Sequence, residues 1–124
     1  MSDHVEIRIP PATPYVGLVR ALAGGLGARL DFTYDQIMDL HIAIDEVCSR
    51  LLATTDAPEA LVLRFTVDDG QLSFEARADG NLRADREFLN PMSRMILEAL
   101  VDRFDIVQDP DGYRVQVEVQ RAAT

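Results

Sequence analysis

Residues 33–52, TYDQIMDLHIAIDEVCSRLL, constrain the fold most, because their apolar side chains recur at three- and four-residue steps. This spacing predicts one amphipathic α-helix with an apolar stripe against a core. Thr33 is a suitable N-cap, and Gln36 three residues later completes a capping box. The predicted stripe consists of Ile37, Leu40, Ile44, Val47, Cys48 and Leu51.

A second face of the same predicted helix carries charge at helical spacing. Its members are Asp35, Asp39, Glu46 and Arg50, with Ala43 as a small gap between them. Glu46 and Arg50 are four residues apart, so we expect an ion pair of about 0.3–0.5 kcal/mol if they are exposed. The charged face is compatible both with a structural role and with a functional site.

Short stretches of alternating apolar and polar residues predict strands on both sides of this helix. The expected strands are His4–Ile9, Leu61–Val67, Gln71–Ala78, Asp105–Gln108 and Tyr113–Val119. Asp69-Gly70 and Asp109-Pro110-Asp111-Gly112 are turn sequences that join the last four strands into two hairpins. We expect a short turn at Thr54–Pro58 and a loop over the polar residues Asp79–Phe88.

Two further helices are expected. Thr13–Leu30 has helical apolar spacing, although Gly24, Gly25 and Gly27 each lower its intrinsic stability by roughly 1 kcal/mol. These glycines indicate close approach of another backbone or a weak last turn of the helix, and we favour this packing interpretation over a functional one. Asn90 as N-cap and Pro91 at the first position begin the other helix. Its apolar residues are expected to point inward: Met92, Met95, Ile96, Ala99 and Leu100.

The order of these elements predicts the fold class. It runs strand, two helices, hairpin, helix, hairpin over 124 residues, with no internal repeat and no linker. We therefore expect a single α+β domain over residues 1–124, a two-layer sandwich in which three helices cover one face of a mostly antiparallel sheet.

Composition excludes several functions. The formal net charge of −9 argues against nucleic-acid binding, and a large partner should be basic or apolar with a basic rim. All twelve basic residues are arginines, so a phosphate-loop lysine and a Schiff-base lysine are both ruled out. We see neither a membrane span nor a secretory signal. The lone Cys48 suits the reducing cytoplasm as a buried, inert thiol.

Two segments carry a family resemblance. Tyr15-Val16-Gly17-Leu18-Val19-Arg20 and Leu40–Cys48, LHIAIDEVC, resemble the anti-sigma factor and serine kinase family of RsbW and SpoIIAB type, part of the GHKL superfamily of ATP-binding domains. The resemblance implies a cytoplasmic, dimeric bacterial regulator that holds a sigma factor and is released by an anti-anti-sigma protein of STAS type. It also implies phosphorylation of a serine on that antagonist with ATP and magnesium.

The resemblance implies roles for particular residues. Arg20 would contact the sigma factor and the antagonist, with Tyr15 and Gly17 of the same segment beside it in the partner site. Glu46 would be the general base if kinase activity is retained. Asp79 and Gly80 would be the degenerate remains of the motif that binds adenine.

The sequence departs from the family at three nucleotide-binding positions. Arg50 stands where the family has an asparagine that ligates magnesium, and a guanidinium cannot ligate a cation. Ala78 stands at the adenine-reading aspartate when the motif is aligned on Gly80, although Asp79 is adjacent. The segment EFLNPMSRM, in place of the lid, has no glycine. We therefore expect no cofactor, with ATP and magnesium disfavoured by Arg50 and Ala78.

Two hypotheses follow: an anti-sigma factor that has lost or weakened ATP binding, and an active serine kinase that phosphorylates the antagonist. The expected partners are a sigma factor, an anti-anti-sigma protein and a second copy of the chain, with neither nucleic acid nor membrane. His41, near the edge of the apolar stripe, is interpreted as structural, and His4 has no functional interpretation. We expect no metal site, because neither histidine has a second ligand at suitable spacing.

Overall fold

The helix predicted over residues 33–52 is present as α2 (Tyr34–Thr54) in the computed structural model, which describes residues 2–83 and 87–122. The Thr33 hydroxyl accepts a hydrogen bond from the Gln36 amide, and the Gln36 side chain accepts one from the Thr33 amide. The capping box is thus confirmed. The inward stripe of α2 is almost fully buried from Leu40 to Leu51.

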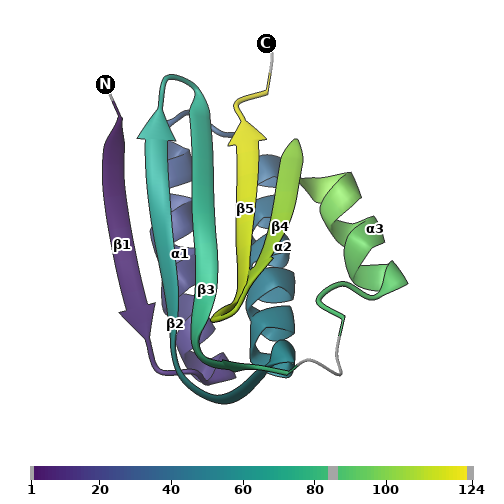
Figure 1. Ribbon diagram of the computed structural model, residues 1–124. Coiled ribbons are helices and arrows are strands. Elements are labelled where there is room, and N and C mark those ends of the chain that lie inside the picture. Colours follow the sequence, from purple (N-terminus) through teal and green to yellow (C-terminus); the bar gives the residue numbers. More distant parts are fainter. Residues whose placement is uncertain (1, 84–86, 123–124) are drawn as a thin grey trace.

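The described residues form five strands in one sheet of order β1-β2-β3-β5-β4, and every neighbouring pair is antiparallel. Helices α1 (Thr13–Arg29) and α2 lie side by side behind this sheet (Figure 1). The predicted α+β class is therefore confirmed. The strands are β1 (Asp3–Ile9), β2 (Thr55–Asp68), β3 (Gln71–Leu82), β4 (Arg103–Asp109) and β5 (Gly112–Gln120).

The strands β2 and β3 are longer than expected. β2 begins at Thr55 directly after α2, so the predicted turn over residues 54–58 is wrong; the irregularity there is a register shift between Asp56 and Ala60. β3 continues to Leu82, because its last residues pair with the start of β2. The first part of the loop predicted over residues 79–88 is therefore wrong, and its residues 84–86 lie outside the described residues.

The glycines of α1 confirm the packing interpretation at two of three positions. A Cβ on Gly24 would lie 3.1 Å from the His41 side chain, and one on Gly27 would lie 3.2 Å from the Phe32 ring. The close neighbours are thus side chains of α2 and of the loop before it. Gly25 does not fit the interpretation, since a Cβ there would meet nothing within 4 Å.

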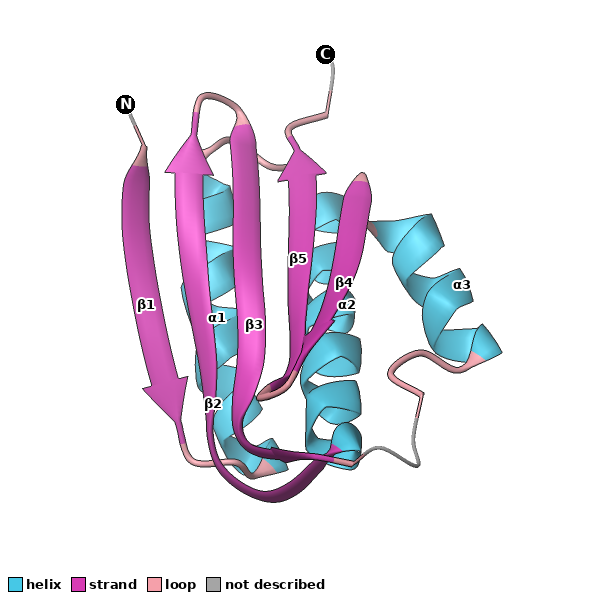
Figure 2. Ribbon diagram, viewed as in Figure 1, coloured by secondary structure: helices cyan, strands magenta, loops and turns pink. Residues whose placement is uncertain are grey.

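The third helix, α3 (Pro91–Leu100), lies beside the β4 edge and packs on α2 and β4 (Figure 2). The Asn90 side chain caps it by accepting a hydrogen bond from the Ser93 amide, as predicted. The expected inward orientation of Met92, Met95 and Ala99 is wrong, since the two methionines are 67% and 63% exposed and Ala99 is exposed as well. The helix buries only Ser93 and Leu97, because it touches the domain along one narrow side.

None of the helices in the described ranges is both long and apolar enough to span a bilayer.

Candidate functional site

The charged face of α2 meets α3 and the segment that precedes it. Glu46 lies one turn before Arg50 on α2. Both side chains extend towards α3 and the segment before it. The Glu46 carboxylate accepts a hydrogen bond from the hydroxyl of Ser93, a buried residue of α3. The Arg50 guanidinium donates to the carbonyl oxygens of Phe88, at 2.5 Å, and Glu87, at 2.8 Å. Both charged groups are therefore bound by the chain itself.

The predicted ion pair between Glu46 and Arg50 is wrong. No ion pair joins them in the described part of the chain, although helical spacing would allow one. The reason is tertiary: main-chain carbonyls and a serine hydroxyl reach the two groups from a segment about forty residues away. Spacing along a helix shows which side chains are neighbours, but not which other groups compete for them.

The segment before α3 is part of the core. Phe88 and Leu89 are buried, and the Phe88 ring lies 5.2 Å from the Tyr113 ring, centroid to centroid. This packing was not predicted from the sequence, in which the segment is notable only for its lack of glycine. Two adjacent apolar residues inside a polar stretch were the signal that could have revealed it. Ser93 was also missed, and nothing in the sequence marks it as a partner of Glu46.

Arg20 lies in a second part of the helix layer, between α1 and α2. Its guanidinium forms an ion pair with Asp45 of α2 at 2.5 Å, and both side chains remain partly exposed. The two residues line a cavity of about 470 Å³ that Glu46 and Cys48 also line. The structure thus brings Arg20 and Glu46, two of the predicted site residues, to the same cavity.

The other two predicted partner residues differ in position. A Cβ on Gly17 would lie 3.3 Å from the Arg20 guanidinium, so Gly17 is next to Arg20. Tyr15 is exposed, and its five-residue separation from Arg20 turns it about 140° around the helix axis. Tyr15 and Arg20 therefore lie on different sides of α1.

Cys48 lines the same cavity but is not a nucleophile. Burial raises the pKa of the Cys48 thiol to about 12, and the nearby Asp45 carboxylate acts in the same direction. Because thiol chemistry needs the thiolate, this cysteine is inert near neutral pH.

The residues of the adenine motif lie on opposite faces of the sheet. Ala78 is buried in the core, on the side of β3 that faces the helices. Successive strand residues point to opposite faces, so Asp79 points away from the helices. There it accepts hydrogen bonds from Arg8, at 2.7 Å, and Arg77, at 3.2 Å. The Arg8 bond holds the pKa of the Asp79 carboxyl below its usual value, and the Arg77 bond adds to this.

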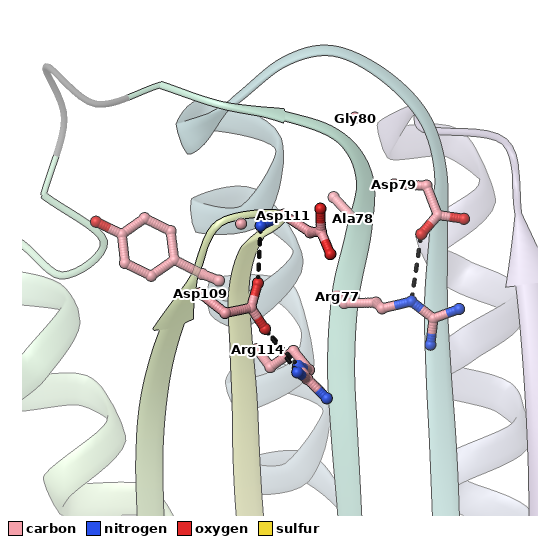
Figure 3. Close-up of a pocket in the computed structure, with 9 residues that line it drawn as sticks. Arg77, Ala78, Asp79, Gly80, Asp109, Asp111 and Arg114 are labelled. Atoms are coloured by element: carbon pink, nitrogen blue, oxygen red, sulfur yellow. Dashed lines mark hydrogen bonds and ion pairs between the residues drawn. The ribbon is translucent and has the colours of Figure 1, made fainter.

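Figure 3 shows Asp79 and Arg77 at a cavity of about 410 Å³ that extends to the turn between β4 and β5. The structure does not bring Asp79 together with Glu46, since the sheet separates Asp79 from the helix layer. Gly80 has a φ of +154°, and a Cβ there would lie 2.7 Å from the Thr55 methyl group. The backbone and the start of β2 therefore account for this glycine without a ligand.

In a comparison with known proteins, no family model matches the chain. The chain is 30% identical over 83 residues to the serine-protein kinase RsbW of Bacillus subtilis, covering 64% of this chain and 52% of that protein. It is 29% identical over 94 residues to the RsbW of Halalkalibacterium halodurans, covering 73% and 58% respectively. The matched region therefore spans about half the length of these relatives.

A crystal structure of the RsbU and RsbW domains of a Mycobacterium tuberculosis protein superposes on 98% of this chain and 33% of that one, with a TM-score of 0.76 and 16% identity. This likeness supports the fold, a GHKL-like α+β sandwich. The sequence matches and this shared fold agree: the chain is similar to RsbW-type proteins in both sequence and fold.

Proposed function

We propose that this protein is an RsbW-type regulator that acts by binding proteins and not by transferring phosphate. It holds a sigma factor and releases it to an anti-anti-sigma protein of STAS type. Its nucleotide pocket no longer binds ATP, or binds it only weakly. The family relationship supports the class of partner, and the contacts of Arg50 support the loss of nucleotide.

The observation that carries the proposal is the position of Arg50. Its guanidinium stands where the resemblance puts a magnesium ligand, and it is bound to two carbonyl oxygens of the segment before α3. A fixed cation repels magnesium and offers it no lone pair. The same segment buries Phe88 against Tyr113, so the chain itself packs beside α2.

Calorimetric titration with Mg-ATP tests the loss of nucleotide. We expect no binding heat from the folded protein, and micromolar binding would contradict the proposal. The Arg50→Asn variant restores an amide oxygen at the position of the magnesium ligand. Arg94→Asn, on the exposed side of α3, is the matched control. If Arg50→Asn binds Mg-ATP and Arg94→Asn does not, the loss of nucleotide binding is caused by the charge of Arg50.

Arg20 is the proposed contact with the partner, with Gly17 beside it and Tyr15 on a different side of α1. Arg20→Glu should abolish binding to the cognate sigma factor in a titration, whereas Arg29→Glu near the exposed end of α1 should not. Because Arg20 pairs with Asp45, the double variant Arg20→Glu/Asp45→Arg restores an internal ion pair. If this double variant also fails to bind the sigma factor, loss of the internal ion pair cannot be the cause, and the lost contact is the one between Arg20 and the partner. If Arg20→Glu bound the sigma factor with full affinity, the assignment of Arg20 as the partner contact would be wrong.

A second candidate is the serine kinase, and one contact favours it. Glu46 accepts a hydrogen bond from a serine hydroxyl, which is the arrangement that a general base needs. Here the serine is the chain's own buried Ser93, so Glu46 is already occupied. Transfer of labelled phosphate from ATP to the antagonist, lost in Glu46→Gln, would establish the kinase.

The proposal includes a homodimer. Light scattering at several protein concentrations measures the mass directly, and a monomer at all concentrations would contradict this part alone.

A further inference from the structure

Helix α2 carries a second apolar stripe that the core does not use. Tyr34, Met38 and Ile42 follow at four-residue steps and are 76%, 40% and 46% exposed. Residues four apart lie on the same side of a helix, so these three form one continuous strip. The inward stripe that includes Leu40 and Ile44 is fully buried, whereas the outward one leaves much of its apolar surface exposed.

The neighbouring helix α1 extends this surface. Leu18 is 57% exposed, Ala21 is exposed, and a Cβ on Gly25 would meet nothing within 4 Å. Helical spacing turns these residues away from the buried side that includes Val19 and Ala23. Helices α1 and α2 contact each other and lie side by side behind the sheet (Figure 1), so the sides of both helices that point away from the sheet are on the same face of the domain. We call Leu18, Tyr34, Met38 and Ile42 the outer strip.

Negative charge borders the outer strip. Asp31, Asp35 and Asp39 lie near the N-terminal end of α2, and none of them forms an ion pair within residues 2–83 and 87–122. Arg20 pairs with Asp45 and so does not neutralise this border. The chain as a whole has a formal net charge of −9.

We propose that the outer strip docks an amphipathic helix of a partner protein, with basic residues on both flanks of its apolar face. The apolar face would cover Met38 and Ile42, while the flanks would pair with the free carboxylates. Helix docking by apolar contacts at one-turn intervals suits a surface made of two parallel ridges. This inference rests on the proposed partner-binding function and names the surface and the chemistry of recognition.

Charge selects this occupant over a second copy of the chain. A two-fold symmetric contact through the outer strip would bring the same patch of both copies together. The border of Asp35 and Asp39 would then face an identical acidic border, which opposes association. A basic helix meets the same border favourably.

Two synthetic helical peptides of 18 residues serve as the probe. Both have leucines at positions i, i+3, i+4 and i+7, and their flanks are lysine in one and glutamate in the other. We expect the lysine peptide to bind at least about tenfold more tightly by fluorescence anisotropy, and its affinity to fall with added salt. Equal affinity for the two peptides, or no binding of either, would overturn the proposal.

Matched double variants locate the binding. Met38→Ser/Ile42→Ser removes the centre of the outer strip, and Met92→Ser/Met95→Ser removes an even more exposed apolar pair from α3. We expect the first to weaken the lysine peptide by about tenfold or more, and the second to leave it unchanged. Equal losses would show non-specific adsorption and defeat the inference. The inference would also be wrong if the protein were a dimer that Met38→Ser/Ile42→Ser dissociates and Met92→Ser/Met95→Ser does not, because a second copy would then occupy the outer strip.

The sigma factor itself separates this inference from the proposed function. If Arg20→Glu abolishes its binding while Met38→Ser/Ile42→Ser retains full affinity, the outer strip is not the docking surface and the proposed function stands. If neither the wild type nor any variant binds it, the proposed function fails, whatever the peptides do.

Discussion

At the scale of single residues, tertiary contacts decide what the charged groups of α2 do. Arg50 and Glu46 lie one turn apart on the helix, yet Arg50 is bound by the segment that leads into α3 and Glu46 by Ser93 of α3 itself. Arg20 and Asp45, from different helices, form the ion pair instead. The same scale explains Cys48, whose thiol is buried in the core between charged neighbours.

The Cys48 thiol provides a prediction with a definite pH window. Its pKa is about 12 in the folded protein against 9.0 for an unperturbed thiol. As pH rises, the thiol therefore ionises in the unfolded chain before it ionises in the folded protein. The contribution of this residue to stability is therefore complete below pH 9 and is lost as pH rises towards 12. Between pH 8 and pH 10.5 we expect a loss of about 2 kcal/mol in the free energy of unfolding.

Urea unfolding at the two pH values measures this loss, and Cys48→Ala is the control because it removes the titrating group. The pH dependence should be smaller in the variant by about the stated amount. An equal pH dependence in both proteins would refute the assignment to Cys48.

At the scale of elements, α1 and α2 pack where glycines leave room. Gly24 and Gly27 face side chains at close range, whereas Gly25 faces open space. The three glycines look alike in the sequence, and only the orientation of α1 distinguishes them. The same is true of α3, where Met92 and Met95 fit an inward stripe by spacing but point outward, because the helix contacts α2 and β4 along Ser93 and Leu97.

Alanine substitutions should separate the glycines of α1. Gly25→Ala adds a methyl group in open space and should raise the free energy of unfolding by about 0.5–1 kcal/mol, through helix propensity alone. In Gly27→Ala the new methyl group meets the Phe32 ring at 3.2 Å, and the strain should cancel or exceed this gain. Thermal or urea unfolding measures the stability of the two variants. If Gly27→Ala were more stable than Gly25→Ala, the close packing of Gly27 against Phe32 would be contradicted.

At the scale of the whole molecule, acidic charge dominates the surface. The ion pairs of the described residues join partly exposed side chains, as between Arg114 and Asp109, and solvent screening keeps the contribution of each pair to stability small. A formal net charge of −9 on a small domain opposes the compact state through repulsion. Screening of this repulsion should outweigh the loss of the surface pairs.

Added salt should therefore stabilise the protein. We expect the unfolding temperature to rise between 20 and 500 mM sodium chloride, a range over which the Debye length falls from about 20 Å to about 4 Å. Asp31→Asn/Asp105→Asn neutralises two exposed carboxylates and should show a smaller rise. An unfolding temperature that falls with salt would mean that the surface ion pairs matter more than the net charge.

The sequence alone determined the fold class, the capped helix over residues 33–52 and both hairpins, because periodicity and turn residues act locally. It also carried the family resemblance, which the relatives of RsbW type confirm. Contacts between distant segments were decided only by the tertiary structure: the bonds of Arg50 and Glu46, the side of the sheet on which Asp79 lies, and the exposure of Met92 and Met95. Such contacts depend on how the elements are placed against one another, and spacing within one element does not encode that placement.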